Sequence, residues 1–249
     1  GVVGVRVRIS EAAARLYAVL AASDLGDDVA GLDGARLDTP WAEAIGRAWP
    51  RAQGRLALQG LGLTHLELDA LLAALASPPD PLRDGPGRTL CSAVRDGLQQ
   101  LDPPTGFGTA PDTLLSDLQA LREQLWAPRG LRPPPLVLLD VPALGRRARA
   151  TTVDGERRIA TSLAMPPDHV LMQVLHEEMH PVTDPLVLAE LGHSLADRDT
   201  RPGARGFALH QRLEQTAVEA TAAFLNARAP EHLGAFERWL GAHSAVSPA

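Results

Sequence analysis

The sequence has one cysteine, Cys91, and no lysine among its 249 residues. A single cysteine excludes an internal disulfide framework and leaves histidine and carboxylate side chains as the available metal ligands. Aromatic residues make up only 4% of the chain, and Tyr17 is its one tyrosine. Since Ala, Leu, Pro and Gly are abundant, we attribute the missing lysine to a composition bias of the genome rather than to function.

The chain also lacks an excess of basic charge and a long apolar run. Its formal net charge is −6, which argues against a nucleic-acid partner, because nucleic-acid-binding proteins usually carry a basic patch. No apolar run reaches the ~18 residues of a membrane-spanning helix, so no membrane partner is expected. The first residues lack the apolar block of a signal peptide. We therefore expect a cytoplasmic protein, although a signal peptide removed by processing would leave the same sequence. The oligomeric state is not indicated.

The first half of the chain has mainly helical periodicity. Residues 3–9 alternate as in a half-exposed strand, and Ser10 is a typical helix cap before the run EAAARLYAVLAA. Further helices are predicted over residues 40–49, 64–76, 89–101 and 111–126.

The pattern changes after the prolines at 133–135. LVLLD reads as a short buried strand, and Asp154-Gly155 lies between two extended runs, which is a strong hairpin signal. Helical patterns then recur over the HExxH segment and over residues 186–196, 205–228 and 230–243. We predict an α+β fold that is mostly helical, with a small sheet or hairpin beside a motif helix and a following ligand helix. A division near residue 130 separates a helical region of unknown role, residues 1–130, from a metal-binding catalytic region, residues 131–249.

The segment LHEEMHP, residues 175–181, contains the pattern HExxH. Residues four apart lie on one face of a helix, so His176 and His180 could bind one metal ion. A helix over PPDHVLMQVLHEEMH separates two faces: a polar stripe of His169, Gln173, His176 and His180, and an apolar one of Val170, Leu171, Val174 and Leu175.

The chemistry of a metal site explains this spacing. Two neutral imidazoles bind zinc and leave room for a third ligand and a water, whose pKa the metal lowers. Glu177 lies beside the stripe and is the candidate general base for that water. Glu178 points away and is expected to be a surface carboxylate or, at best, a residue that supports a ligand from behind. His169 is expected to be a polar residue of the first helical turn rather than a ligand.

Pro181 directly follows the second histidine. A proline ring clashes with the carbonyl four residues earlier, so the helix is expected to end or kink at His180. The two histidines would remain neighbours on its last turn. Asp184, in the turn expected to follow, could orient His180 from behind.

The third ligand is sought in the later helix HQRLEQTAVEATAAFL. The extended pattern HExxHxxGxxH is excluded because Leu186 stands where its third histidine would be. Two glutamates of the later helix compete. Glu214 lies next to the apolar stripe of this helix, where a carboxylate needs a partner, whereas Glu219 lies on its polar side. Glu214 is therefore the preferred ligand and Glu219 the alternative.

HEEMH followed by LEQTAVEA resembles the gluzincin metallopeptidases, over about residues 136–228. This resemblance implies a zincin core that holds one zinc ion, with His176, His180 and Glu214 as ligands, Glu177 as general base, and a peptide or protein as substrate. Two positions depart from the family pattern. Val218 replaces an aspartate that often follows the ligand glutamate, and no tyrosine is near to stabilise an oxyanion, a role left to His193 or His210.

Two other functions use the same residues. Two histidines and a carboxylate are also the donor set of non-haem Fe(II) oxygenases, because donors alone do not determine the metal. The chain could also be a non-catalytic metal-binding protein that docks a partner through its helical region.

Overall fold

The structure, a computed structural model, describes residues 4–25, 32 and 34–243. The chain forms two compact units, each discontinuous in sequence: unit 1 comprises Gly1–Arg6, Ala110–Pro135 and Met165–Ala249, and unit 2 comprises Val7–Thr109 and Leu136–Ala164. The predicted division near residue 130 falls within unit 1. The regions 1–130 and 131–249 therefore do not coincide with the two units. A separate role for residues 1–130 stays a prediction.

The sheet has the strand order β1-β2-β4-β3, formed by β1 (Val5–Arg8), β2 (Leu136–Asp140), β3 (Ala148–Val153) and β4 (Glu156–Thr161). Strand β2 pairs with β4 in parallel, whereas β3 and β4 are antiparallel. Their connection is the predicted hairpin. Asp154 and Gly155 both have positive φ, 50° and 77°, as a two-residue turn between antiparallel strands requires. The hairpin and the LVLLD strand are thus confirmed, and the part of the first strand before residue 4 lies outside the described residues.

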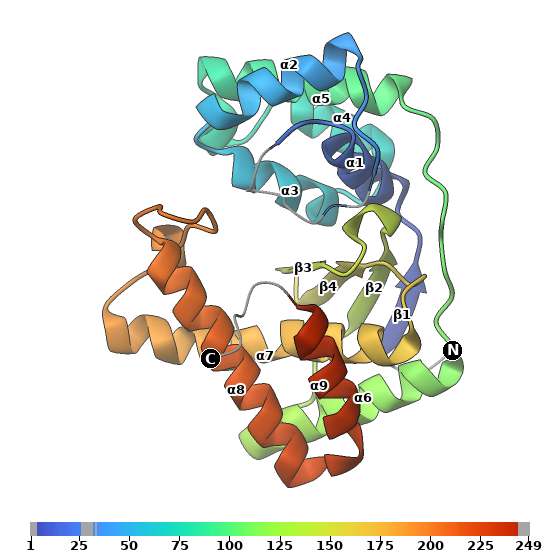
Figure 1. Ribbon diagram of the computed structural model, residues 1–249, viewed down its shortest axis with the longest axis vertical. Helices are drawn as coiled ribbons and strands as arrows, with labels where there is room; N and C mark the ends of the chain where they lie inside the picture. Colours follow the sequence, from blue (N-terminus) through green and yellow to red (C-terminus); the bar gives the residue numbers. More distant parts are fainter. Residues whose placement is uncertain (1–3, 26–31, 33, 244–249) are drawn as a thin grey trace. The chain divides into compact units, whose positions relative to one another are not determined.

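Unit 2 carries the helices α1 (Glu11–Ala21), α2 (Pro40–Ala48), α3 (Arg55–Thr64), α4 (Leu68–Ala76) and α5 (Gly85–Gln100) (Figure 1). Ser10 caps α1 as predicted, because its Oγ accepts the Ala13 N–H at 3.1 Å. Helix α3 was not predicted. Its glycines lower helix propensity. One of them, Gly62, allows α3 to pack closely on α1, because a Cβ at this position would lie only 2.9 Å from a methyl carbon of Leu16.

Tyr17 is buried in the core of unit 2, where its hydroxyl donates to the Gln59 carbonyl at 3.3 Å. Burial raises the pKa of Tyr17 to about 12, against the opposing charge of Arg149. Its surroundings are those of a structural core residue.

Unit 1 is helical around the HExxH segment. Its helices are α6 (Asp112–Trp126), α7 (Pro167–Leu191), α8 (Phe207–Arg228) and α9 (Leu233–Ala242). Helices α8 and α9 lie side by side and both pack on α7, which also contacts α6 (Figure 1). With the four-stranded sheet, this confirms the predicted α+β class. Within the described residues, no helix combines the length and apolar character needed to cross a bilayer.

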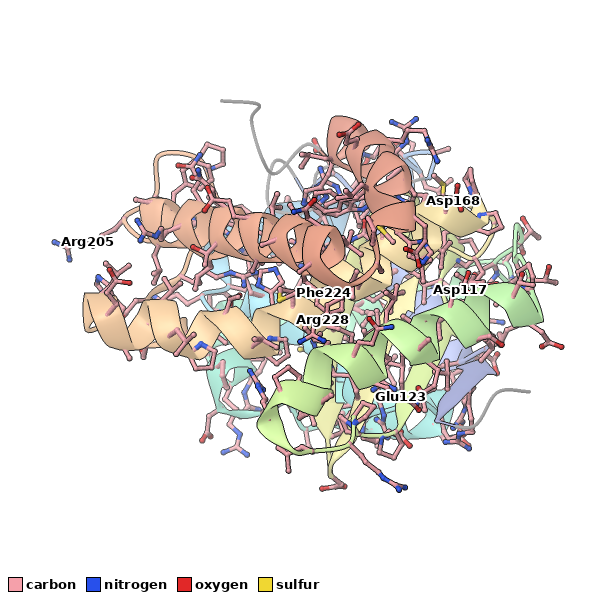
Figure 2. All side chains as sticks on the ribbon, turned by 90° about the horizontal axis from the view of Figure 1, so that it is seen from below. Asp117, Glu123, Asp168, Arg205, Phe224 and Arg228 are labelled. Atoms are coloured by element: carbon pink, nitrogen blue, oxygen red, sulfur yellow. The ribbon has the colours of Figure 1, made fainter. Side chains whose placement is uncertain are left out.

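Two small apolar clusters join α7 to its neighbours. Met179 packs with Leu125 of α6 and Ala217 of α8, and Phe224 near the end of α8 covers this cluster (Figure 2). The second cluster joins the end of α7 to the start of α8 through Val187, Leu209 and Leu213.

The structure corrects the expectation for Glu178. This carboxylate is 2% exposed, not on the surface, and it pairs with the equally buried Arg122 of α6 at 3.2 Å. Arg122 also donates to Gln119 Oε1 and to the Pro134 carbonyl. A helical wheel drawn for α7 alone cannot show this, because it does not include the arginine that α6 presents.

Of the two outcomes expected at His180, an end or a kink of the helix, the end is wrong. Helix α7 continues through Pro181 and Pro185 to Leu191, so the separate helix predicted over residues 186–196 does not exist, and Gly192 ends α7 in the left-handed conformation. An interior proline costs about 3 kcal/mol. Packing on both sides of Pro181 offsets that cost, since Met179 before it and Val187 after it each contact α8.

Candidate metal centre

Three predicted ligands meet where α7 and α8 pack together. His176 Nε2 lies 3.0 Å from Glu214 Oε2, and His180 Nε2 lies 3.0 Å from Glu214 Oε1. The two histidine Nε2 atoms are 3.2 Å apart. All three residues are buried, with exposed fractions of 0%, 9% and 8% for His176, His180 and Glu214. Two nitrogens and one carboxylate therefore form a compact triangle of potential donors.

The size of this triangle suits a zinc ion. Zinc–nitrogen and zinc–oxygen bonds of about 2.0–2.2 Å in a tetrahedron place neighbouring donors roughly 3.3–3.5 Å apart. The observed separations of 3.0–3.2 Å are only slightly shorter. Small outward shifts would bring the three donors to bonding distance of one ion.

Asp184 fixes the orientation of His180. Its Oδ1 lies 2.9 Å from His180 Nδ1, so Nδ1 carries a proton that it donates to the carboxylate. A neutral His180 then has its lone pair on Nε2, which faces His176 and Glu214. Metal-binding histidines are commonly held by such a carboxylate behind the ring.

The charges of the site are strongly coupled. Burial lowers the pKa of His180, but Asp184 and Glu214 outweigh burial and raise it to about 10. Burial by itself raises the pKa of Glu214. His176, His180 and His243 nevertheless hold the pKa of this carboxyl well below its usual value. In the metal-free chain a protonated His180 thus supplies the positive charge that the carboxylates require.

Glu177 follows the first histidine and is half-buried. Its negative charge is among the causes that raise the pKa of His180. It is not among the donors of the triangle, and its role as general base stays a prediction.

The two glutamates of α8 point in different directions, as the helical periodicity indicated. Glu214 is buried and faces α7, whereas Glu219 is exposed and accepts a hydrogen bond from Gln215 Nε2 at 3.2 Å. The fold therefore brings Glu214, and not Glu219, to the two histidines. Metal ligation by Glu214 stays a proposal.

The other histidines considered from the sequence lie elsewhere. His193 is half-exposed after the end of α7 and pairs with Asp197 at 3.1 Å. The ring of His210 lies 6.0 Å from that of Phe207 on the first turn of α8. His169 is half-buried on the first turn of α7. In the described part of the chain, none of these three belongs to the donor group around Glu214.

Sequence reasoning missed two residues at the end of the chain. His243 is 9% exposed, and its Nε2 lies 3.6 Å from Glu214 Oε2. Trp239, one turn earlier, stacks on His243 with ring centroids 4.5 Å apart and also contacts His176 at 4.9 Å. The spacing of Trp239 and His243 predicts only a shared helix face. Nothing in the sequence indicated that this face meets α7.

Several buried nitrogens of the site lack hydrogen-bond partners in the described structure: His176 Nδ1 and both ring nitrogens of His243. An unsatisfied buried polar atom is costly and calls for an explanation, and for His243 Nε2, which lies 3.6 Å from Glu214 Oε2, an ion held at the site can provide one. His176, Glu214 and His243 each place one donor atom within 4.8 Å of the other two. The nitrogen and carboxylate donors present here therefore fit zinc, with Fe(II) as the other metal that such donors bind.

In comparisons with known proteins, no family model, no curated protein and no solved structure matches the chain.

Proposed function

We propose that the chain is a zinc-dependent metallopeptidase with His176, His180 and Glu214 as ligands and Glu177 as general base. The observation that supports this most is the convergence of the three donors within 3.2 Å of one another. Residues far apart in the sequence meet in a buried site, and the HExxH spacing supplies a glutamate beside them.

Each residue of this site has a distinct task. A zinc ion bound there would activate a water molecule and polarise the carbonyl of a peptide bond. Glu177 would accept the proton released during attack and deliver it to the leaving amine. Asp184 would keep His180 in the tautomer whose Nε2 lone pair faces the centre.

The substrate class follows from this chemistry alone. A base next to a metal-binding pair of histidines suits hydrolysis of an amide bond, so the proposed substrate is a peptide or protein.

The wide separation of His176 and Glu214 in the chain means that unit 1 must be folded before the site exists.

A peptide-digestion assay tests the proposal. The chain is treated with a chelator, reloaded with zinc or with Fe(II), and incubated with a diverse peptide mixture whose products are identified by mass spectrometry. We expect cleavage with zinc and none in the chelated sample. Turnover that requires Fe(II) and O₂, without peptide cleavage, would instead support an oxygenase and overturn the peptidase proposal.

A further inference from the structure

We propose that His243 is a fourth protein donor to the metal held by His176, His180 and Glu214. This inference rests on the metal centre of the proposed function, and it adds a residue that the HExxH pattern and the later glutamate do not include.

The position of His243 brings its ring to the site. It follows α9 directly, and its backbone N–H donates to the Leu240 carbonyl at 3.1 Å. From there Nε2 reaches to 3.6 Å from Glu214 Oε2, and the ring lies 5.2 Å from that of His176. A separation of 3.6 Å exceeds a hydrogen bond but is close to the roughly 3.3–3.5 Å between neighbouring donors of a tetrahedral zinc ion.

The orientation of the ring is fixed by Trp239. The two rings are stacked at an interplanar angle of 23°. The indole Nε1 in turn donates to Gln173 Oε1 at 2.8 Å, and Gln173 lies on α7 one turn before His176. The helix that carries the two motif histidines therefore also anchors the tryptophan that holds His243.

Burial without partners gives the second, independent indication. The side chain of His243 is only 7% exposed, yet neither of its ring nitrogens has a hydrogen-bond partner in the described structure. Stacking on Trp239 explains why the ring is buried, and Nε2 faces the Glu214 carboxylate at 3.6 Å, which is beyond a hydrogen bond but within the reach of a shared cation. Leaving a buried nitrogen unsatisfied is costly, and a shared cation removes that cost.

The consequence concerns the coordination of the metal. Three protein ligands leave one tetrahedral position open, as catalytic zinc sites do, whereas four protein ligands close the site. With His243 bound, the resting centre would be closed, and peptide hydrolysis would require His243 to leave or the coordination to expand to five.

The number of imidazoles on the metal tests this directly. X-ray absorption on the full chain loaded with one equivalent of zinc counts them, and chelator competition gives the dissociation constant. H243F keeps an aromatic ring against Trp239 but removes the nitrogens, and H243Q serves if the larger change disturbs folding. H193A, which alters a half-exposed histidine, is the matched control.

We expect three imidazoles in the wild type and in H193A, and two in H243F. The dissociation constant of H243F should be at least about tenfold higher, because even residues behind a ligand change metal affinity by 10–100-fold. Two imidazoles in both wild type and H243F, with equal affinity, would overturn the role of His243 and leave the proposed centre intact. A wild type that binds no zinc, or a H176A/H180A variant that binds it equally well, would overturn the centre itself and this inference with it.

Discussion

Asp184 and His180 lie one helical turn apart on α7, with Asp184 Oδ1 2.9 Å from His180 Nδ1, and Pro181 stands between them. This contact exists because α7 continues through the proline. If the helix ended at His180, Asp184 would be displaced from its place behind the ring. The continuity of α7 therefore determines which tautomer of His180 faces the centre.

Asp184→Asn should weaken zinc binding by about 10–100-fold, because the carboxylate that orients His180 is replaced by a neutral amide. Chelator competition on the purified chain measures the change. Glu190→Gln is the control, since Glu190 is an exposed carboxylate later on the same helix. Equal affinity in both variants would show that Asp184 does not orient a ligand.

Glu214→Ala and Glu219→Ala form a matched pair on α8. The first removes a buried carboxylate 3.0 Å from both motif histidines, and the second removes an exposed one. We expect Glu214→Ala to lose stoichiometric zinc and Glu219→Ala to retain it, as measured by elemental analysis after dialysis. The reverse pattern would make Glu219 the ligand.

Glu177→Gln should separate metal binding from chemistry. The amide cannot accept a proton, so peptide cleavage should fall by about 10²–10⁴-fold, while zinc stoichiometry stays that of the wild type. Cleavage rates at saturating peptide and zinc content are measured on the same preparation, with Glu190→Gln as control. Unchanged activity would exclude Glu177 as the general base.

Arg122 and Glu178 form the buried ion pair that joins α6 to α7, with exposed fractions of 0% and 2%. Removing one partner, as in Glu178→Gln or Arg122→Met, should lower the free energy of unfolding by roughly 3–5 kcal/mol, because the other charge stays buried. The double variant R122M/E178L should recover much of this loss. Denaturant unfolding followed by circular dichroism measures it. The control is Arg238→Met, which breaks the exposed pair with Asp168 and should change stability little.

Local patterns in the sequence predicted much of the fold. The Asp154-Gly155 turn, the Ser10 cap and the LVLLD strand depend on neighbouring residues, and each is present. Periodicity likewise indicated that Glu214 faces inward and Glu219 outward, because the two lie on different sides of one helix.

Features that depend on distant packing were not predictable in this way. Pro181 is a local stop signal that contacts with α8 override. The sequence alone predicts an exposed Glu178, because its partner Arg122 comes from another helix. His243 was missed for the same reason: its place beside His176 depends on α9 packing on α7, and no spacing in the sequence encodes that contact.

The metal content of the chain purified without added metal tests the central claim most directly. Elemental analysis of the wild type and of H176A/H180A, expressed and purified in parallel, gives the number of ions per chain. We predict about one zinc per wild-type chain and none in the double variant, since the variant lacks both motif histidines. A wild type without stoichiometric metal, or an equal zinc content in H176A/H180A, would contradict the account.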